Sequence, residues 1–206
     1  MSETSPLAVN HHADHPGFSG VTGAVFALIF LLTGRASAAF AADLMRVGHD
    51  DHVVDIGCGP GTAARAAAHR RAAVTGVDPS ASMLRLARLA TRRNAAISWR
   101  EGTAESLPVA EDSATLVWAL ATVHHWRDVD AGLREAHRVL RPGGRLLAVE
   151  RRTEPGANGV ASHGWTAEQA EAFAALCRRA GFADVAVGTG HAGRRDVWAV
   201  TARTPE

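Results

Sequence analysis

The chain has 206 residues, with 22 Lys or Arg against 21 Asp or Glu, 11 His and a formal net charge of +1. This length suits one domain with an extended terminus. A chain of this length can bury a hydrophobic core without disulfides or a structural metal ion. Hydrophobic residues make up 47% and charged residues 21%, a balance too apolar for a disordered chain and too mixed for a membrane bundle. The near-neutral charge offers no field for nucleic acid, so we expect no nucleic-acid partner.

The two cysteines, Cys58 and Cys177, lie far apart in the sequence. A pair so separated in a chain of this length does not form a disulfide framework of the secreted type. We therefore expect reduced thiols and a cytoplasmic protein.

The amino-terminal segment from Pro16 to Gly34 has no charged residue, and its most apolar part runs from Val25 to Leu32. That part is shorter than the ~20 residues that cross a bilayer. The residues before Pro16 also lack the Lys or Arg of a signal peptide. We expect no membrane partner, and we assign residues 1–34 to a flap over a pocket or a buried helix and residues 35–206 to the domain itself.

Three histidines of this segment, His11, His12 and His15, are of a metal-ligating type. Neither cysteines nor a cluster of carboxylates accompanies them, and chain termini are usually disordered. We therefore expect a flexible leader at these positions and no metal site.

From Ala39 to Val47 the apolar residues follow a helical period, and Gly48 suits the end of that helix. Strand and helix patterns then alternate along the chain. The strands expected are Val53–Ile56, Ala73–Val77, Ile97–Arg100, Thr115–Ala119, Arg145–Glu150, Val185–Gly188 and Val197–Ala202. The helices expected are Thr62–His69, one capped by Ser80 or Ser82 and running to Ala90, Val129–Leu140 and Thr166–Ala180.

Strands that alternate with helices pair in parallel through right-handed crossovers. The fold class expected is therefore α/β, a doubly wound Rossmann-like sheet in a single domain. In such sheets the ligand lies beyond the carboxyl ends of the strands, at the switch point in strand order.

The first strand-to-helix turn, Gly57 to Gly61, lies at that point. Its glycines permit positive φ and let a ligand approach the backbone. A dinucleotide fingerprint would need glycine at position 62, where Thr62 stands, so the spacing is wrong for a pyrophosphate cradle. Asp78, about twenty residues further on at the end of the second strand, suits two ribose hydroxyls. The pattern predicts a nucleoside site.

Five ordered motifs between about Asp50 and Glu150 closely resemble those of class I S-adenosylmethionine-dependent methyltransferases. The similarity is greatest to a small-molecule branch that includes quinone-biosynthesis, natural-product and sugar O-methyltransferases. The tail fits the family's last helix and antiparallel strand pair, so the resemblance implies a mostly parallel sheet with an antiparallel last strand. The motifs are VVDIGCGPG (Val53–Gly61), VDPS (Val77–Ser80), EGTAESLP (Glu101–Pro108), VHHW (Val123–Trp126) and RVLRPGGRL (Arg138–Leu146).

The resemblance implies S-adenosyl-L-methionine as cofactor and S-adenosyl-L-homocysteine as product. The first turn and the end of the fourth strand would hold the methionine moiety of the cofactor. The acid that ends the second strand would hold the ribose. The next helix and residues 103–104 would contact the adenine. The cofactor-binding residues so implied are Asp55, Gly57, Cys58, Gly59, Asp78, Pro79, Met83, Thr103, Ala104, Ala119 and Leu120.

Two positions depart from the family pattern. Thr103 stands where the family usually has an Asp that accepts from the adenine amine, although a hydroxyl is also an acceptor. Thr115 stands where the family usually has an Asp early in the fourth strand. Both departures bear on the affinity for the cofactor more than on its identity.

A histidine pair, His124 and His125, follows the fourth strand, on the edge where the transferred methyl should lie. An imidazole with a pKa near ~6.5 suits a general base, and Glu150 at the end of the fifth strand suits an orienter. We name these three residues as catalytic candidates; an alternative is that the pair only leads into the next helix. His163 and Trp165, in the following loop, are expected to form a pocket wall.

The function expected is methyl transfer to a small-molecule acceptor, a hydroxyl above all, by a monomer or homodimer. Three alternatives remain: a small-molecule N-methyltransferase, an NAD(P)-dependent oxidoreductase, and a non-catalytic module that binds S-adenosylmethionine. The glycine spacing argues against the oxidoreductase, and the three catalytic candidates argue against the non-catalytic module.

Overall fold

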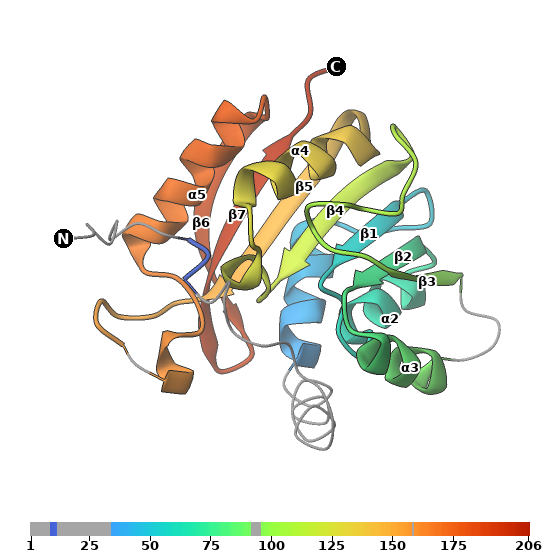
Figure 1. Cartoon of the computed structure of the whole chain (residues 1–206), viewed down its shortest axis with the longest axis horizontal. Coiled ribbons are helices and arrows are strands. Elements are labelled where there is room, and N and C mark those ends of the chain that lie inside the picture. Colours follow the sequence, from blue (N-terminus) through green and yellow to red (C-terminus); the bar gives the residue numbers. More distant parts are fainter. Residues whose placement is uncertain (1–8, 12–33, 92–95, 158) are drawn as a thin grey trace.

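The structure is a computed structural model that describes residues 9–11, 34–91, 96–157 and 159–206 (Figure 1). Within these ranges one sheet has the strand order β3-β2-β1-β4-β5-β7-β6. Strands β1 to β5 pair in parallel, whereas β7 is antiparallel to both β5 and β6. The strands are β1 His52–Ile56, β2 Ala73–Asp78, β3 Ile97–Glu101, β4 Ala114–Leu120, β5 Leu140–Arg151, β6 Ala183–Ala192 and β7 Arg195–Arg203.

The expected fold class, a doubly wound and mostly parallel sheet with an antiparallel last strand, is confirmed, and that strand is β7. The order reverses between β1 and β4, so the switch point lies between the turns that follow these two strands. The described helices are residues 34–44, α2 Thr62–His69, α3 Ala81–Ala90, α4 Val129–Val139 and α5 Ala167–Arg179, with the short 3-10 helices η1 Val123–His125 and η2 Gly159–Ser162.

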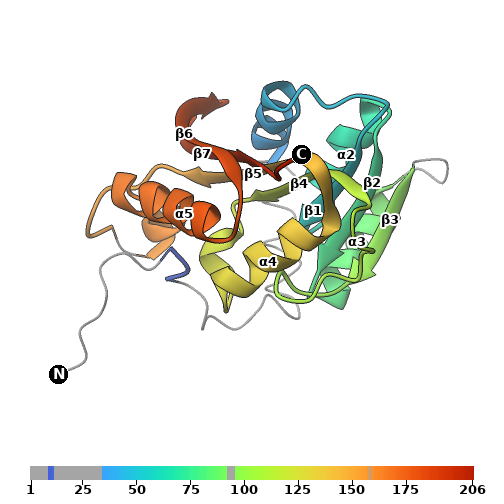
Figure 2. The same ribbon diagram turned by 90° about the horizontal axis from the view of Figure 1, so that it is seen from above.

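The central strands are buried on both faces, as parallel strands between helix layers must be. On one face Val54 and Val117 belong to a core cluster with Leu133 of α4 and Phe173 of α5. On the other face Val53 and neighbouring residues pack with alanines of helix 34–44 and α2. Figure 2 shows α4 and α5 on one side of the sheet and helix 34–44 on the other.

The first described helix ends differently from the expectation. The amide of Arg46 donates to the carbonyl of Asp43, and that of Val47 donates to the carbonyl of Ala42, which is the pattern of a Schellman cap. Arg46, with φ of 49°, takes the left-handed position that we had assigned to Gly48. The helix stops earlier because this cap satisfies its last carbonyls, and the expected glycine end is wrong.

Two further observations concern the cysteines and the apolar character of the helices. Cys58 and Cys177 are both free and buried, as expected for reduced thiols. Among the residues that the structure describes, no helix is long and apolar enough to span a membrane.

Candidate active site

The turn between β1 and α2 is folded tightly against the end of β2. The amides of Gly57 and Cys58 both donate to the carbonyl of Val77, at 2.8 and 3.0 Å. A Cβ added at Gly57 would lie 2.2 Å from the Thr122 hydroxyl, whereas one added at Gly59, where φ is 50°, meets nothing within 4 Å. The backbone at Gly59 therefore faces open space at the switch point.

Asp78 connects the turn to the end of β2. Its Oδ2 accepts from the amide of Gly59 and its Oδ1 from the amide of Ser80, both at 2.8 Å. Burial raises the pKa of this carboxyl, and the two amide bonds oppose that effect in part. The sequence placed Gly59 and Asp78 at one site, and the structure joins them by a direct hydrogen bond.

Asp55, near the end of β1, is 2% exposed. Burial raises its pKa to about 7, and the charge of Asp78 adds to the rise against weaker opposing dipoles from Trp118 and Ala64. Its Oδ2 has no hydrogen-bond partner within the described part of the chain. A buried acceptor without a partner is costly unless a ligand supplies a donor.

These observations fit the cofactor that the resemblance implies. S-adenosylmethionine carries an ammonium group that would satisfy a buried carboxylate and ribose hydroxyls that would donate to Asp78, and the open backbone at Gly59 leaves room for it. Elsewhere on this edge Met83 and Ala104 are buried, Ala119 lies near the end of β4 beside Leu120, and Pro79 and Thr103 are exposed.

Thr115 does not lie at this edge. It is the second residue of β4, so it is separated from Leu120 by about 16 Å at the rise of an extended strand. Its hydroxyl donates to Asp51 Oδ1 at 2.6 Å and accepts from the amide of His52 at 3.1 Å. Thr115, where the family usually has Asp, thus contributes to packing near the amino-terminal ends of the strands and does not reach the proposed cofactor site.

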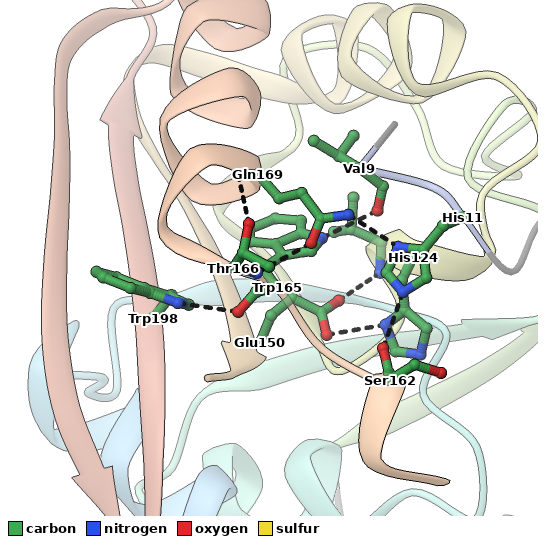
Figure 3. Close-up of polar contacts among 10 residues, drawn as sticks. Val9, His11, His124, Glu150, Ser162, Trp165, Thr166, Gln169 and Trp198 are labelled. Carbon is green, nitrogen blue, oxygen red and sulfur yellow. Dashed lines mark hydrogen bonds and ion pairs between the residues drawn. The ribbon is translucent and has the colours of Figure 1, made fainter. Parts of the chain in front are cut away.

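A buried contact between a histidine and a carboxylate lies at the carboxyl ends of β4 and β5. His124, in η1, is 3% exposed and Glu150 is 1% exposed. Glu150 Oε2 lies 2.8 Å from Nδ1 of His124, and its Oε1 accepts from the amide of Val123 at 2.9 Å (Figure 3). The carboxylate therefore fixes both the imidazole and the backbone of η1, as the sequence predicted for an orienting acid.

His125 and His163 complete a group of imidazoles around this pair. The ring of His125 lies 4.1 Å from that of His124, centroid to centroid. The ring of His163 lies 5.5 Å from His124 and 5.8 Å from His125. The sequence placed His163 only in a pocket wall, because no local pattern shows that the loop after β5 returns to η1.

Residues 9–11 pack against the same group. The indole N–H of Trp165 donates to the carbonyl of Val9 at 2.9 Å, and the side-chain Nδ2 of Asn10 donates to the carbonyl of Trp126 at 3.0 Å. Nε2 of His11 lies 2.9 Å from the carbonyl of Ser162, and its ring lies 6.0 Å from that of His124. His11 is thus held by contacts rather than part of a flexible leader; His12 and His15 lie outside the described residues.

The central part of the chain is similar to known proteins. Residues 54–148 match the family model described as "Methyltransferase domain". The C-methyltransferase UbiE of ubiquinone and menaquinone biosynthesis from Rubrivivax gelatinosus is 43% identical over 101 residues, which is 48% of this chain and 39% of that protein. The ubiquinone biosynthesis O-methyltransferase of a Methylobacterium species is 36% identical over 98 residues, 47% of this chain and 39% of that protein.

Two solved structures share the fold. An S-adenosylmethionine-dependent methyltransferase from Mesorhizobium loti has a TM-score of 0.67 at 23% identity, covering 84% of this chain and 99% of its own. A phosphoethanolamine N-methyltransferase of Haemonchus contortus, solved with S-adenosylhomocysteine, has a TM-score of 0.70 at 21% identity, covering 90% of this chain and 57% of its own. At these identities the likeness concerns the fold.

The motifs and the comparisons together identify residues 54–148 as a methyltransferase domain, which is a little less than half of this chain. The predicted family and the cofactor of that family are confirmed. The chain spans about two fifths of the length of the two curated relatives described above.

Proposed function

We propose that the protein transfers the methyl group of S-adenosylmethionine to a hydroxyl group of a small molecule, with His124 as proton acceptor. The observation that carries this proposal is the buried contact between Nδ1 of His124 and Glu150 at 2.8 Å. It lies beyond β4 and β5, at the sheet edge that also carries Gly59 and Asp78 beyond β1 and β2.

The cofactor side of the site is built by backbone and carboxylates. Asp55 would accept from the ammonium of the methionine moiety, Asp78 would accept from the ribose hydroxyls, and the backbone of Gly57 to Gly59 would line the cleft between them. When bound, the sulfonium supplies an electrophilic methyl group. The protein then has to position an acceptor oxygen in line with it, and orientation of this kind contributes up to about 7–11 kcal/mol.

The acceptor side needs a group that takes a proton, because a neutral hydroxyl is a weak nucleophile. Nδ1 of His124 is engaged by Glu150, so Nε2 is the nitrogen that would take the hydroxyl proton. Glu150 keeps the ring oriented and stabilises the imidazolium that forms, and general-base help of this kind contributes about 10²–10⁴-fold in rate.

Two other acceptors have support from relatives. UbiE of Rubrivivax gelatinosus is a C-methyltransferase, and the protein from Haemonchus contortus is an N-methyltransferase. A free amine needs little help from a base, whereas a phenolic carbon acceptor does. If turnover depends on His124, the acceptor is not an amine. The position of the new methyl group in the product then shows whether the acceptor atom is oxygen or carbon.

The test separates binding from turnover. His124→Ala and His125→Ala are made singly, affinity for S-adenosylhomocysteine is measured by calorimetry, and methyl transfer is measured with a panel of phenols, sugars and amines. We expect His124→Ala to lower turnover by about 10²–10⁴-fold with nearly unchanged affinity. His125→Ala should cost less, since the contact with Glu150 belongs to His124.

His191→Ala is the matched control, because this exposed histidine pairs with Asp196 in the β6–β7 hairpin. Wild-type turnover in both His124→Ala and His125→Ala would refute the base role. Binding of NADH in place of S-adenosylhomocysteine by the wild-type protein would favour the oxidoreductase.

A further inference from the structure

Three imidazoles from two separate segments converge beside the proposed acceptor site. His124 and His125 come from η1, and His163 comes from the loop after η2. One ligand-type nitrogen from each of the three lies within 4.8 Å of those of the other two. His124 is buried and the other two are half-buried, so the group is enclosed by protein and open on one side.

The surroundings of His124 add a second observation. Histidine ligands of metal ions almost always give their other ring nitrogen to a carboxylate or carbonyl, which fixes the tautomer and raises the basicity of the ligating nitrogen. Glu150 holds Nδ1 of His124 in this way at 2.8 Å, and its second oxygen is itself fixed by the amide of Val123. The orienting carboxylate that a metal site needs is therefore already in place.

The spacing also suits an ion. Two imidazole nitrogens bound to one tetrahedral zinc ion at ~2.0–2.1 Å are about 3.4 Å apart. The ligand atoms here lie within 4.8 Å, so each pair has to close by at most about 1.4 Å, a change within reach of side-chain rotation.

The donor set decides which ions fit. Neutral imidazoles suit zinc, copper, nickel, cobalt and iron, whereas magnesium and calcium prefer carboxylate, carbonyl and water oxygens. Three histidines around one ion also leave a fourth coordination position for water or substrate, as in catalytic zinc centres.

We propose that His124, His125 and His163 bind a divalent transition-metal ion of the zinc type, with Glu150 as the orienting partner of His124. The sequence predicts no metal ligands among the histidines of the amino-terminal segment, and the site proposed here lies elsewhere in the chain. His124 would be a ligand when an ion is bound and the proton acceptor when none is bound, and the ion would make an acceptor hydroxyl at the open position more acidic. That last consequence rests on the proposed function, whereas the ion site does not.

Cobalt is the direct probe, because Co²⁺ bound by nitrogen ligands at low coordination number absorbs strongly in the visible range. The full chain, purified without a histidine tag and stripped with a chelator, is titrated with Co²⁺ and then with Zn²⁺. We expect one Co²⁺ per chain, displacement by one equivalent of Zn²⁺, and no competition from Mg²⁺. Zn²⁺ should also raise the Tm of the wild-type protein.

Variants locate the site. Glu150→Gln removes only the charge of the orienting partner and should weaken Co²⁺ binding by about 10–100-fold. His163→Ala removes a ligand and should weaken binding further and abolish the visible band, while His191→Ala should bind as the wild type does. Affinity for S-adenosylhomocysteine and the circular dichroism spectrum verify that each variant is folded.

Absence of a visible band in the wild type, or equal Co²⁺ affinity in the wild type and His163→Ala, would overturn the proposal. An equal loss in His191→Ala would do so as well, because it would mean binding to scattered surface histidines. Since the measured quantity is the bound ion, failure of methyl transfer leaves this result intact, and failure of cobalt binding leaves the proposed methyl transfer intact.

Discussion

At the scale of single residues, the burial of the Asp55 carboxyl lowers the stability of the folded protein. Its ordinary pKa of 3.8 rises to about 7 through burial, and its Oδ2 has no hydrogen-bond partner among the described residues. The folded protein therefore holds this proton more tightly than the unfolded chain does. Stability falls as the pH rises between these two values, and the full cost is present above pH 7.

Asp55→Asn tests this cost. At pH 8 the amide carries no charge to desolvate, so we expect the ligand-free variant to be more stable than the wild type by up to about 4 kcal/mol, since each of the roughly three pKa units corresponds to about 1.4 kcal/mol. Near pH 4 the advantage should vanish, because the wild-type carboxyl is then protonated when folded. Chemical unfolding at both pH values measures the difference.

The same variant should bind S-adenosylmethionine more weakly, because an amide is a poorer partner for an ammonium group. An Asp55→Asn protein that is less stable than the wild type at pH 8, or that keeps full affinity, would contradict the role given to this carboxyl.

At the scale of elements, the turn between β1 and α2 divides its glycines between folding and binding. Gly57 is pressed against Thr122 and Gly61 against Trp99, at 2.2 and 2.3 Å from an added Cβ, whereas Gly59 faces open space. All three have positive φ. The first two positions therefore serve packing as well as conformation, and Gly59 alone of the three has room for a ligand against its backbone.

The different surroundings of Gly57 and Gly59 can be tested by comparing Gly59→Ala with Gly57→Ala. Gly59→Ala meets no neighbour, so we expect a loss of about 1–2 kcal/mol of stability from its left-handed backbone, with a much larger loss of affinity for S-adenosylhomocysteine. Gly57→Ala must displace Thr122 and should lose more stability than Gly59→Ala. Thermal melts and calorimetry of the two variants give the answer; equal cofactor affinity in Gly59→Ala and the wild type would contradict the assignment.

At the scale of the whole molecule, the site joins segments that are distant in the sequence. Residues 9–11 contact Trp126. They also contact Ser162, Trp165 and Gln169, as Figure 3 shows. The hydrogen bonds of Val9 and Asn10 bridge 156 and 116 residues of chain. The amino-terminal stretch is thereby attached next to the histidine group. Of the residues 1–34 expected to form a flap or a buried helix, the structure describes only residues 9–11 and 34.

Asn10→Ala probes this attachment. The side chain donates to the carbonyls of Trp126 and Arg127, so its loss should cost about 1 kcal/mol. The local effect should be larger, since release of residues 9–11 exposes the indole N–H of Trp165 to solvent. We expect hydrogen exchange at that indole to accelerate while the amides of β1 and β4 exchange as in the wild type; an unchanged indole would show that Asn10 does not hold this segment.

Most of the fold could be predicted, because its signals are local. The helix Thr62–His69 agrees with α2, and Ser80 caps α3 as expected. The contacts around His124 could be predicted only in part. The proximity of His124 and Glu150 follows from neighbouring parallel strands, whereas that of His163 and His11 depends on how loops return across the edge, which no periodicity encodes.

The sequence by itself determined the layers, the direction of the strands and the edge where a ligand binds, because hydrophobic period and glycine position act within a few residues of chain. Only the tertiary structure decided that Oδ2 of Asp55 lacks a partner within the described residues and that His163 meets His124 and His125. Both facts depend on what packs around a side chain in three dimensions, where the cost of desolvation and the distance between donors are set by residues far away in the chain.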